Sequence, residues 1–169
     1  MKFYQQLLLL IITVLGQTQT ANYIPPPSYS GISTVYLNTT NTFYFHSGLQ
    51  NQLGYLEGLQ QIYKDSEAGV WRYKPSTNTI SPLSRSFYGS FLYNNRYYIF
   101  GGIGTELIMK DFWYYDIQGD YWQRVQAPNP IPRRYSFAHT LFDFNNKTYF
   151  AVAGGKSGFY VDNLFDFYL

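Results

Sequence analysis

The sequence predicts an all-β protein made of consecutive four-stranded antiparallel sheets. One apolar strand ends in the glycine pair Gly101 and Gly102, and another ends in Gly154 and Gly155, 53 residues later. An aromatic cluster follows each pair after about ten residues. Self-similarity at a period of about 50 residues is typical of repeat architectures in which each unit is one small sheet. We therefore expect about three such units in the 169 residues.

The middle unit, residues 82–127, shows the pattern most clearly. Its first two strands are expected at 86–93 and 96–100, joined by Asn94 and Asn95. Asparagine tolerates the positive φ angles that a tight hairpin turn requires. A third strand is expected at 111–116 and a fourth near Tyr121 and Trp122, after a turn that contains Gly119.

The unit at 131–169 repeats this order but ends sooner. Its strands are expected at 135–144, 147–153 and 163–169, with an asparagine pair again at the first turn. The segment 163–169 aligns with the third strand of the middle unit. We therefore expect this unit to lack its last strand.

The unit at 24–81 is a degenerate copy. Strands are expected at 29–37 and from Thr42 onward, and Ser47 and Gly48 stand where the glycine pair belongs. Aligning residues 71–80 with 113–122 places Trp71 on the third strand and Ile80 at the position of Trp122. This alignment makes residues 49–69 an inserted loop.

Taken together, these units resemble the kelch repeat, in which an arginine precedes the first strand, a glycine pair ends the second, and a tyrosine and a tryptophan follow. The residues that match this motif are Arg85, Gly101, Gly102, Tyr115 and Trp122 in the middle unit and Arg134, Gly154 and Gly155 in the last. The first unit departs from the motif at Ser28, Ser47 and Ile80. The resemblance implies a β-propeller, whose four-stranded blades surround a central channel.

About three blades form an incomplete ring, because propellers close with four to eight. Open blades would leave large apolar faces exposed. Our preferred interpretation is a truncated chain or a fragment of a longer protein, and the alternative is self-association that completes the ring.

The amino-terminal residues have the features of a secretory signal peptide over residues 1–16. Lys2 precedes a nine-residue apolar run, Leu7–Leu15, that only Thr13 interrupts. Such a run is too short for a stable membrane span but suits a signal peptide. An uncleaved anchor or a core helix is the alternative. We expect a secreted or secretory-pathway protein, with candidate N-glycosylation sites at Asn38 and Asn146.

The composition excludes several kinds of chemistry. The chain has no cysteine, so disulfides, thiolate metal sites and the tyrosine–cysteine centre of oxidases similar to galactose oxidase are excluded. The net charge of +2 gives no reason to expect a nucleic acid partner. His46 and His139 lie on strands of different units, and no catalytic, metal or cofactor motif is present. We assign most of the aromatic residues to the core.

The hypothesis that follows is a non-enzymatic scaffold that binds a protein, with carbohydrate as an alternative ligand. Recognition is expected through loops at one rim, mainly residues 49–69, supported by 102–110 and 156–162. Two alternatives remain open. One is a fragment of a secreted carbohydrate-active propeller enzyme, similar to sialic-acid isomerases. Its candidate groups are Arg85, Arg134, Glu106 and Asp111. The other is an intracellular kelch adaptor, against which the signal-like start argues.

Overall fold

The computed structural model is built from β-strands. It describes residues 30–50, 54–55, 59–65, 68–74, 80–105, 107–127, 131–158 and 165–168. These residues contain thirteen strands and no helix, so none of them provides a helix that could cross a membrane. The prediction of an all-β chain of antiparallel sheets is confirmed. The predicted signal peptide, 1–16, and Ser28 lie outside the described residues.

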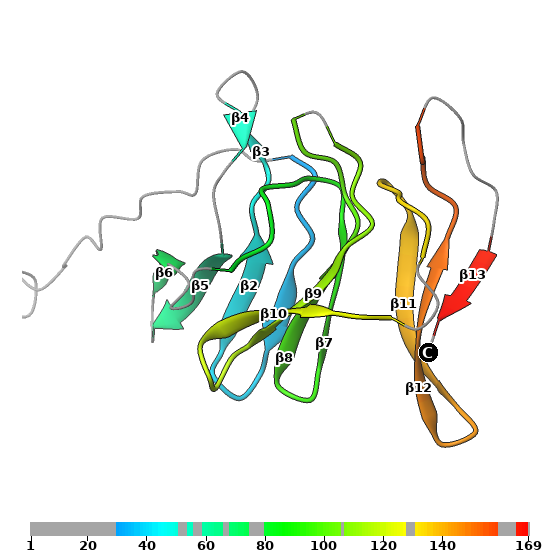
Figure 1. Cartoon of the computed structure of the whole chain (residues 1–169). Coiled ribbons are helices and arrows are strands. Elements are labelled where there is room, and N and C mark those ends of the chain that lie inside the picture. The colour runs from blue at the N-terminus through cyan, green and yellow to red at the C-terminus, as the bar shows by residue number, and fades with distance from the viewer. Residues whose placement is uncertain are drawn as a thin grey trace, which may run out of the picture.

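Three sheets follow one another in sequence order, from blue and cyan through green to orange and red (Figure 1). They do not close into a ring. The second sheet has the order β10-β9-β8-β7. Its strands are β7 (Gly89–Tyr93), β8 (Arg96–Phe100), β9 (Phe112–Asp116) and β10 (Tyr121–Val125). Each strand pairs with its neighbour in the chain, as expected of a blade.

The third sheet has the order β11-β12-β13. Its strands are β11 (Ala138–Phe144), β12 (Lys147–Ala153) and β13 (Phe165–Tyr168). The β11–β12 ladder has seven pairs where β7–β8 has five. The hairpin of the third sheet is therefore longer by two residues on each strand. Both hairpins turn on asparagine pairs with positive φ, as predicted.

The first sheet corrects one prediction. Its order is β1-β2-β5-β6, with β1 (Val35–Leu37), β2 (Thr42–His46), β5 (Leu59–Asp65) and β6 (Ala68–Lys74). A small hairpin, β3 (Leu49–Gln50) and β4 (Gly54–Tyr55), lies between β2 and β5. The segment 49–69 is thus not an inserted loop, because it holds β3, β4, all of β5 and the start of β6.

The alignment of Trp71 was also wrong. Trp71 lies on the fourth strand, β6, and pairs with Ile62 of β5. In the second sheet Trp122 of β10 pairs with Tyr115 of β9 in the same way. Trp71 therefore occupies the motif tryptophan position, whereas Ile80 lies outside the strands and is exposed.

Each first strand begins later than predicted for one physical reason. Gly31, Phe87 and Ser136 have φ angles of 66°, 54° and 52°, which interrupt the extended backbone. The residues immediately before them form single isolated bridges rather than ladders: Ser30, Ser86 and Tyr135. The regular strands begin beyond the interruption.

The hydrophobic core lies at the junctions between sheets. The first junction buries Leu37, Tyr44, Tyr88, Tyr97, Ile99, Trp113, Tyr115 and Trp122. The second junction buries Phe100, Ile131, Phe150 and Val152, with Phe91, Phe112, Phe137 and Leu141 packed against them. Each sheet is therefore stabilised by its neighbours. The β1–β2, β7–β8 and β11–β12 hairpins lie at the lower edge of Figure 1, and the long β8–β9 connection lies at the upper edge.

Candidate partner-binding site

A buried arginine fixes the base of the β8–β9 connection. Arg85 is fully buried, and its guanidinium donates to both carboxylate oxygens of Asp111, at 2.7 and 3.0 Å. The same side chain donates to the carbonyl oxygens of Gly101 (3.0 Å) and Leu83 (2.9 Å). Because these residues come from both ends of the connection and from the segment before β7, one side chain holds three parts of the rim together.

The carboxylate of Asp111 has a structural role in this arrangement. Burial by itself would raise the pKa of the Asp111 carboxyl group, but hydrogen bonds and charge from Arg85 lower it below its ordinary value. The indole of Trp113 adds a further bond, with Nε1 donating to Oδ2 at 2.6 Å. A carboxylate held ionised in this way is a poor general acid.

Arg134 repeats the arrangement in the third sheet. It is fully buried, and its guanidinium donates to the carbonyl oxygens of Gly154 (3.1 Å) and Pro132 (3.4 Å). The carbonyl of Arg134 also accepts a bond from the backbone N–H of Gly102 at 2.8 Å. The motif arginines therefore join sheets and loops. The contacts made by Arg85 and Arg134 are structural, and the other acidic candidate, Glu106, lies outside the described residues.

The glycine pairs permit close approach of neighbouring backbones. Gly101 has a φ of 62°, and a Cβ atom there would lie 2.6 Å from the carbonyl oxygen of Arg134. Gly102 and Gly155 share a φ of 98°. Ser47 stands at the equivalent of Gly101 with a φ of 58°, and its Oγ accepts a bond from the N–H of Arg85. Ser47 thus keeps the positive φ of the glycine position and adds a hydrogen bond to the segment before β7.

The motif tyrosine and tryptophan lie in the first junction. Tyr115 and Trp122 are buried with ring centroids 5.4 Å apart, and Trp122 also contacts His46 edge-on at 5.3 Å. The Tyr115 hydroxyl donates to Asp120 in the β9–β10 turn. These rings are core residues and are not available to stack on a ligand.

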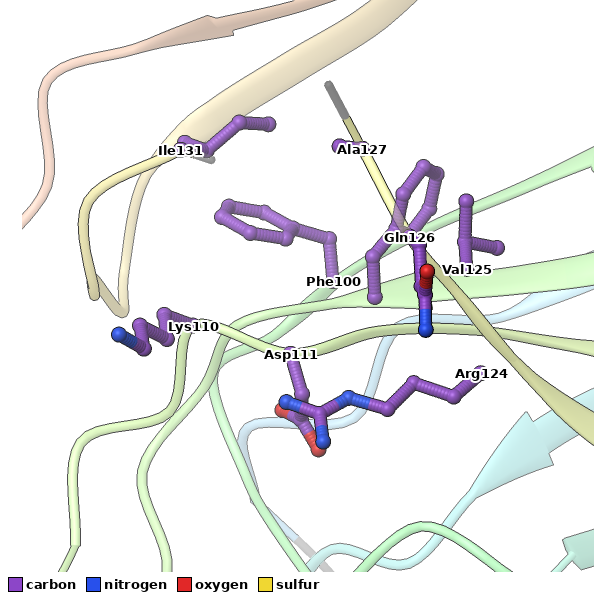
Figure 2. A pocket seen from close by; sticks show the side chains of 9 residues that line it. Phe100, Lys110, Asp111, Arg124, Val125, Gln126, Ala127 and Ile131 are labelled. Carbon is purple, nitrogen blue, oxygen red and sulfur yellow. The ribbon is translucent and has the colours of Figure 1, made fainter. Parts of the chain in front are cut away.

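Above this frame lies a groove at the rim, which we call the rim groove. It consists of two adjoining hollows of about 330 and 350 Å³ that share Lys110, Asp111 and Arg124. The first hollow, shown in Figure 2, is also lined by Phe100, Phe112, Val125, Gln126, Ala127 and Ile131. The second is also lined by Ser81, Leu83, Leu107, Ile108, Met109, Trp113 and Arg133.

The rim groove combines apolar walls with positive charge. Lys110, Arg124 and Arg133 are exposed, and within the described residues none of them forms an ion pair. The negative charge of Asp111 is balanced by Arg85. Three cations next to apolar surface make a site suited to an anionic ligand that also carries apolar groups.

The other predicted surfaces contribute less to this site. Of the three expected recognition segments, 102–110 lines the rim groove, whereas 49–69 belongs largely to the first sheet. The segment 156–162 is described only to residue 158. Asn38 and Asn146 are exposed in the β1–β2 and β11–β12 turns, at the edge opposite the β8–β9 connection (Figure 1).

The two histidines lie on different sheets. His46 is buried and its Nε2 lies 3.2 Å from the carbonyl oxygen of Leu83, while Nε2 of His139 contacts the backbone of Ser90. Burial, followed by the charge of Arg85, lowers the pKa of His46 to about 3. Among the described residues, no cluster of three or more histidine or acidic side chains could hold a metal ion.

Comparison with known protein families agrees with this architecture. The chain matches the KLHDC2/KLHL20/DRC7 Kelch-repeats domain over residues 12–169, a span that overlaps the end of the predicted signal peptide. The protein belongs to the kelch-repeat family. Kelch-repeat domains are typically non-enzymatic modules that bind other proteins. No curated protein matches the chain.

The sequence did not identify the cations of the rim groove. Lys110 comes from the β8–β9 connection, Arg124 from β10, and Arg133 from the connection to the third sheet. No local motif links them, so only the fold brings them together. The sequence feature that pointed toward the groove was the segment 102–110. It begins with two glycines, Gly102 and Gly104, and ends with three apolar residues and Lys110.

Proposed function

We propose that this kelch-repeat chain is an interaction scaffold whose rim groove binds a protein segment with acidic and apolar side chains. The observation that carries the proposal is the position of three exposed cations around apolar hollows of about 330 and 350 Å³. Hollows of this size suit a few side chains of an extended segment, within the range typical of ligand sites.

The frame below the groove supports the proposal because it is rigid. Arg85 is fully buried and binds both ends of the β8–β9 connection, so Lys110 is held next to an anchored residue, Asp111. Arg124 projects from β10, a strand with full pairing to β9. A site formed in advance loses little conformational entropy on binding.

A random linear peptide library displayed on phage provides the probe. Selection on the wild-type chain should enrich peptides in which Asp or Glu lies next to large apolar residues. The double variant Lys110→Glu/Arg124→Glu should bind a selected peptide at least roughly tenfold more weakly, since two attractive charges become repulsive. Lys147→Glu, a matched exposed lysine on β12, should leave affinity unchanged. Selected peptides without acidic residues, or equal binding by the double variant, would overturn the proposal.

We also propose that the protein enters the secretory pathway and carries glycans at Asn38 and Asn146. The support is the apolar run after Lys2, together with the exposed turns in which both asparagines lie. A glycan at either turn would project from the edge opposite the β8–β9 connection, so it would leave the rim groove open.

Expression of the whole chain in a glycosylating secretory host tests this second proposal. The wild type should appear in the medium and shift in mobility when an N-glycosidase removes its glycans. Asn38→Gln and Asn146→Gln should each remove one part of that shift, and deletion of residues 1–16 should abolish both secretion and shift. A wild-type chain that stays in the cytosol without glycan contradicts this proposal and leaves the rim groove proposal intact.

A further inference from the structure

Backbone hydrogen bonds join consecutive sheets at one repeated position. Gly31, Phe87 and Ser136 are equivalent, because each has a φ between 52° and 66° and precedes a first strand. The N–H of Phe87 donates to the carbonyl of Gly31 at 2.6 Å, and the N–H of Ser136 donates to the carbonyl of Phe87 at 2.9 Å. Phe87 thus uses both its backbone N–H and its carbonyl in bonds to neighbouring sheets. Within the described residues, the N–H of Gly31 and the carbonyl of Ser136 have no such partner.

The next residue on each sheet inserts into the preceding sheet. The Tyr88 hydroxyl accepts from the N–H of His46 and donates to the carbonyl of Ser33 in the first sheet. Phe137 packs on Phe100 of the second sheet at 5.5 Å. The equivalent residue of the first sheet is Ile32, which is 40% exposed. The first sheet therefore has an inserting residue without a sheet to receive it in the described part of the chain.

We call the face that each sheet turns toward the preceding sheet its upstream face. In the second and third sheets the cross-strand pairs Leu92–Tyr97 and Leu141–Phe150 lie on this face, and Tyr97 and Phe150 are buried at the junctions. Counting from the glycine position, the equivalent pair of the first sheet is Tyr36–Phe43. Its rings are 4.7 Å apart and the residues are 43% and 41% exposed.

The opposite face of each sheet is its downstream face. On the second sheet it carries the stacked pair Phe91–Tyr98, and Phe91 packs on Phe150 of the third sheet at 4.6 Å. The equivalent pair of the third sheet is the smaller Thr140–Ala151.

Further small and aromatic residues complete the downstream face of the third sheet. Ala153 stands in place of Phe100, and Ala138 in place of Gly89. Phe142 and Tyr149 stack at 5.2 Å beside Thr140 and Ala151. This face therefore has a shallow centre of small residues next to an aromatic pair.

We propose that the downstream face of the third sheet binds the upstream face of the first sheet in a second copy of this chain. The proposed contact has the same arrangement as the two junctions between sheets within one chain. The aromatic pair Tyr36–Phe43 meets the shallow centre at Thr140 and Ala151, and the N–H of Gly31 donates to the carbonyl of Ser136. Ile32, which is smaller than Phe137, packs on Ala138, which is larger than Gly89.

This contact joins two different faces, so each copy can form it twice. Head-to-tail contacts generate closed rings when the rotation between units permits it. Two copies supply six sheets, which lies within the range of four to eight blades that close propellers. The product is a closed dimer, and its formation is independent of any ligand in the rim groove.

Light scattering coupled to size-exclusion chromatography of the whole chain, at micromolar concentration, tests the proposal. The wild type should have twice the mass of one chain. Phe43→Lys and Thr140→Lys, exposed residues on the two faces, should each be monomeric with an unchanged circular dichroism spectrum. The matched control Leu107→Lys, an exposed apolar residue at the rim, should remain dimeric.

Mixing the two variants tests the direction of the contact. Phe43→Lys keeps an intact third sheet and Thr140→Lys keeps an intact first sheet, so the mixture should form a dimer through one interface, more weakly than the wild type. A monomeric wild type, a dimer formed by either variant alone, or a mixture that stays monomeric would overturn the proposal. Wild-type species larger than a dimer would overturn ring closure.

Discussion

Arg85 donates to both carboxylate oxygens of Asp111, at 2.7 and 3.0 Å, and this pair anchors the rim connection to the second sheet. The guanidinium also binds the carbonyl of Gly101, which directly follows β8, while Asp111 directly precedes β9. The two ends of the connection are therefore closed by one side chain. The geometry of the rim groove depends on this closure, because Lys110 and Asp111 both line it.

Arg85→Met should lower the free energy of unfolding by about 3 to 5 kcal/mol, because it leaves the carboxylate of Asp111 without its buried partner. Arg96→Met is the matched control: Arg96 bonds Asp116 at 3.1 Å but is 41% exposed. An exposed pair contributes little to stability, so the loss in Arg96→Met should be much smaller. Urea unfolding followed by tryptophan fluorescence measures both variants, and equal losses would contradict the structural role of Arg85.

His46 should make the fold sensitive to mild acid. Below pH 6.5 the unfolded chain binds a proton at His46, whereas the folded chain, in which the pKa is about 3, does not. Stability therefore falls between pH 7 and pH 5, by about 2 kcal/mol from this group. In this window Asp111, whose pKa is lowered, stays ionised, and Tyr88, whose pKa burial raises, stays neutral.

His46→Gln should remove this part of the pH dependence. Urea midpoints of the wild type and the variant at pH 7 and pH 5 give the comparison. If the wild type and His46→Gln lose the same stability over this interval, His46 is not the acid-sensitive group.

Gly101→Ala should destabilise the junction between the second and third sheets. The added Cβ would lie 2.6 Å from the backbone carbonyl of Arg134, at a φ of 62° that disfavours alanine. We expect a loss of about 2 kcal/mol or more in the free energy of unfolding. Gly158→Ala, where a Cβ would have no neighbour within 4 Å, should be nearly neutral. Similar unfolding midpoints for the two variants would show that the close approach at Gly101 carries little energy.

Sequence reasoning predicted the second and third sheets well because local signals mark them. Alternating aromatic strands, asparagine turns and glycine pairs coincide there, and β8 and β12 have the predicted bounds. It failed in the first sheet, where β5 (Leu59–Asp65) carries four polar or charged residues, Gln60, Gln61, Lys64 and Asp65, a composition typical of a loop. The resemblance of Trp71 to the start of the middle aromatic cluster then favoured the wrong strand.

The rim groove could be predicted only in part. The segment 102–110 was identified as a recognition loop because it lies between two strongly predicted strands. The cations at Arg124 and Arg133 could not be placed beside it, since their meeting depends on the pairing of β9 with β10 and on the course of the chain into the third sheet. Such long-range proximity leaves no trace in the spacing of residues.

The junction bonds at Gly31, Phe87 and Ser136 are made by main-chain atoms, and three unlike side chains occupy that position. A blade can therefore change its sequence at this point without losing its connection to the next. Because these bonds do not depend on side chains, one blade can replace another at this connection. A blade from another kelch protein, inserted between the first and second sheets, would find its donor and acceptor already in place, so the number of consecutive sheets can be altered by design.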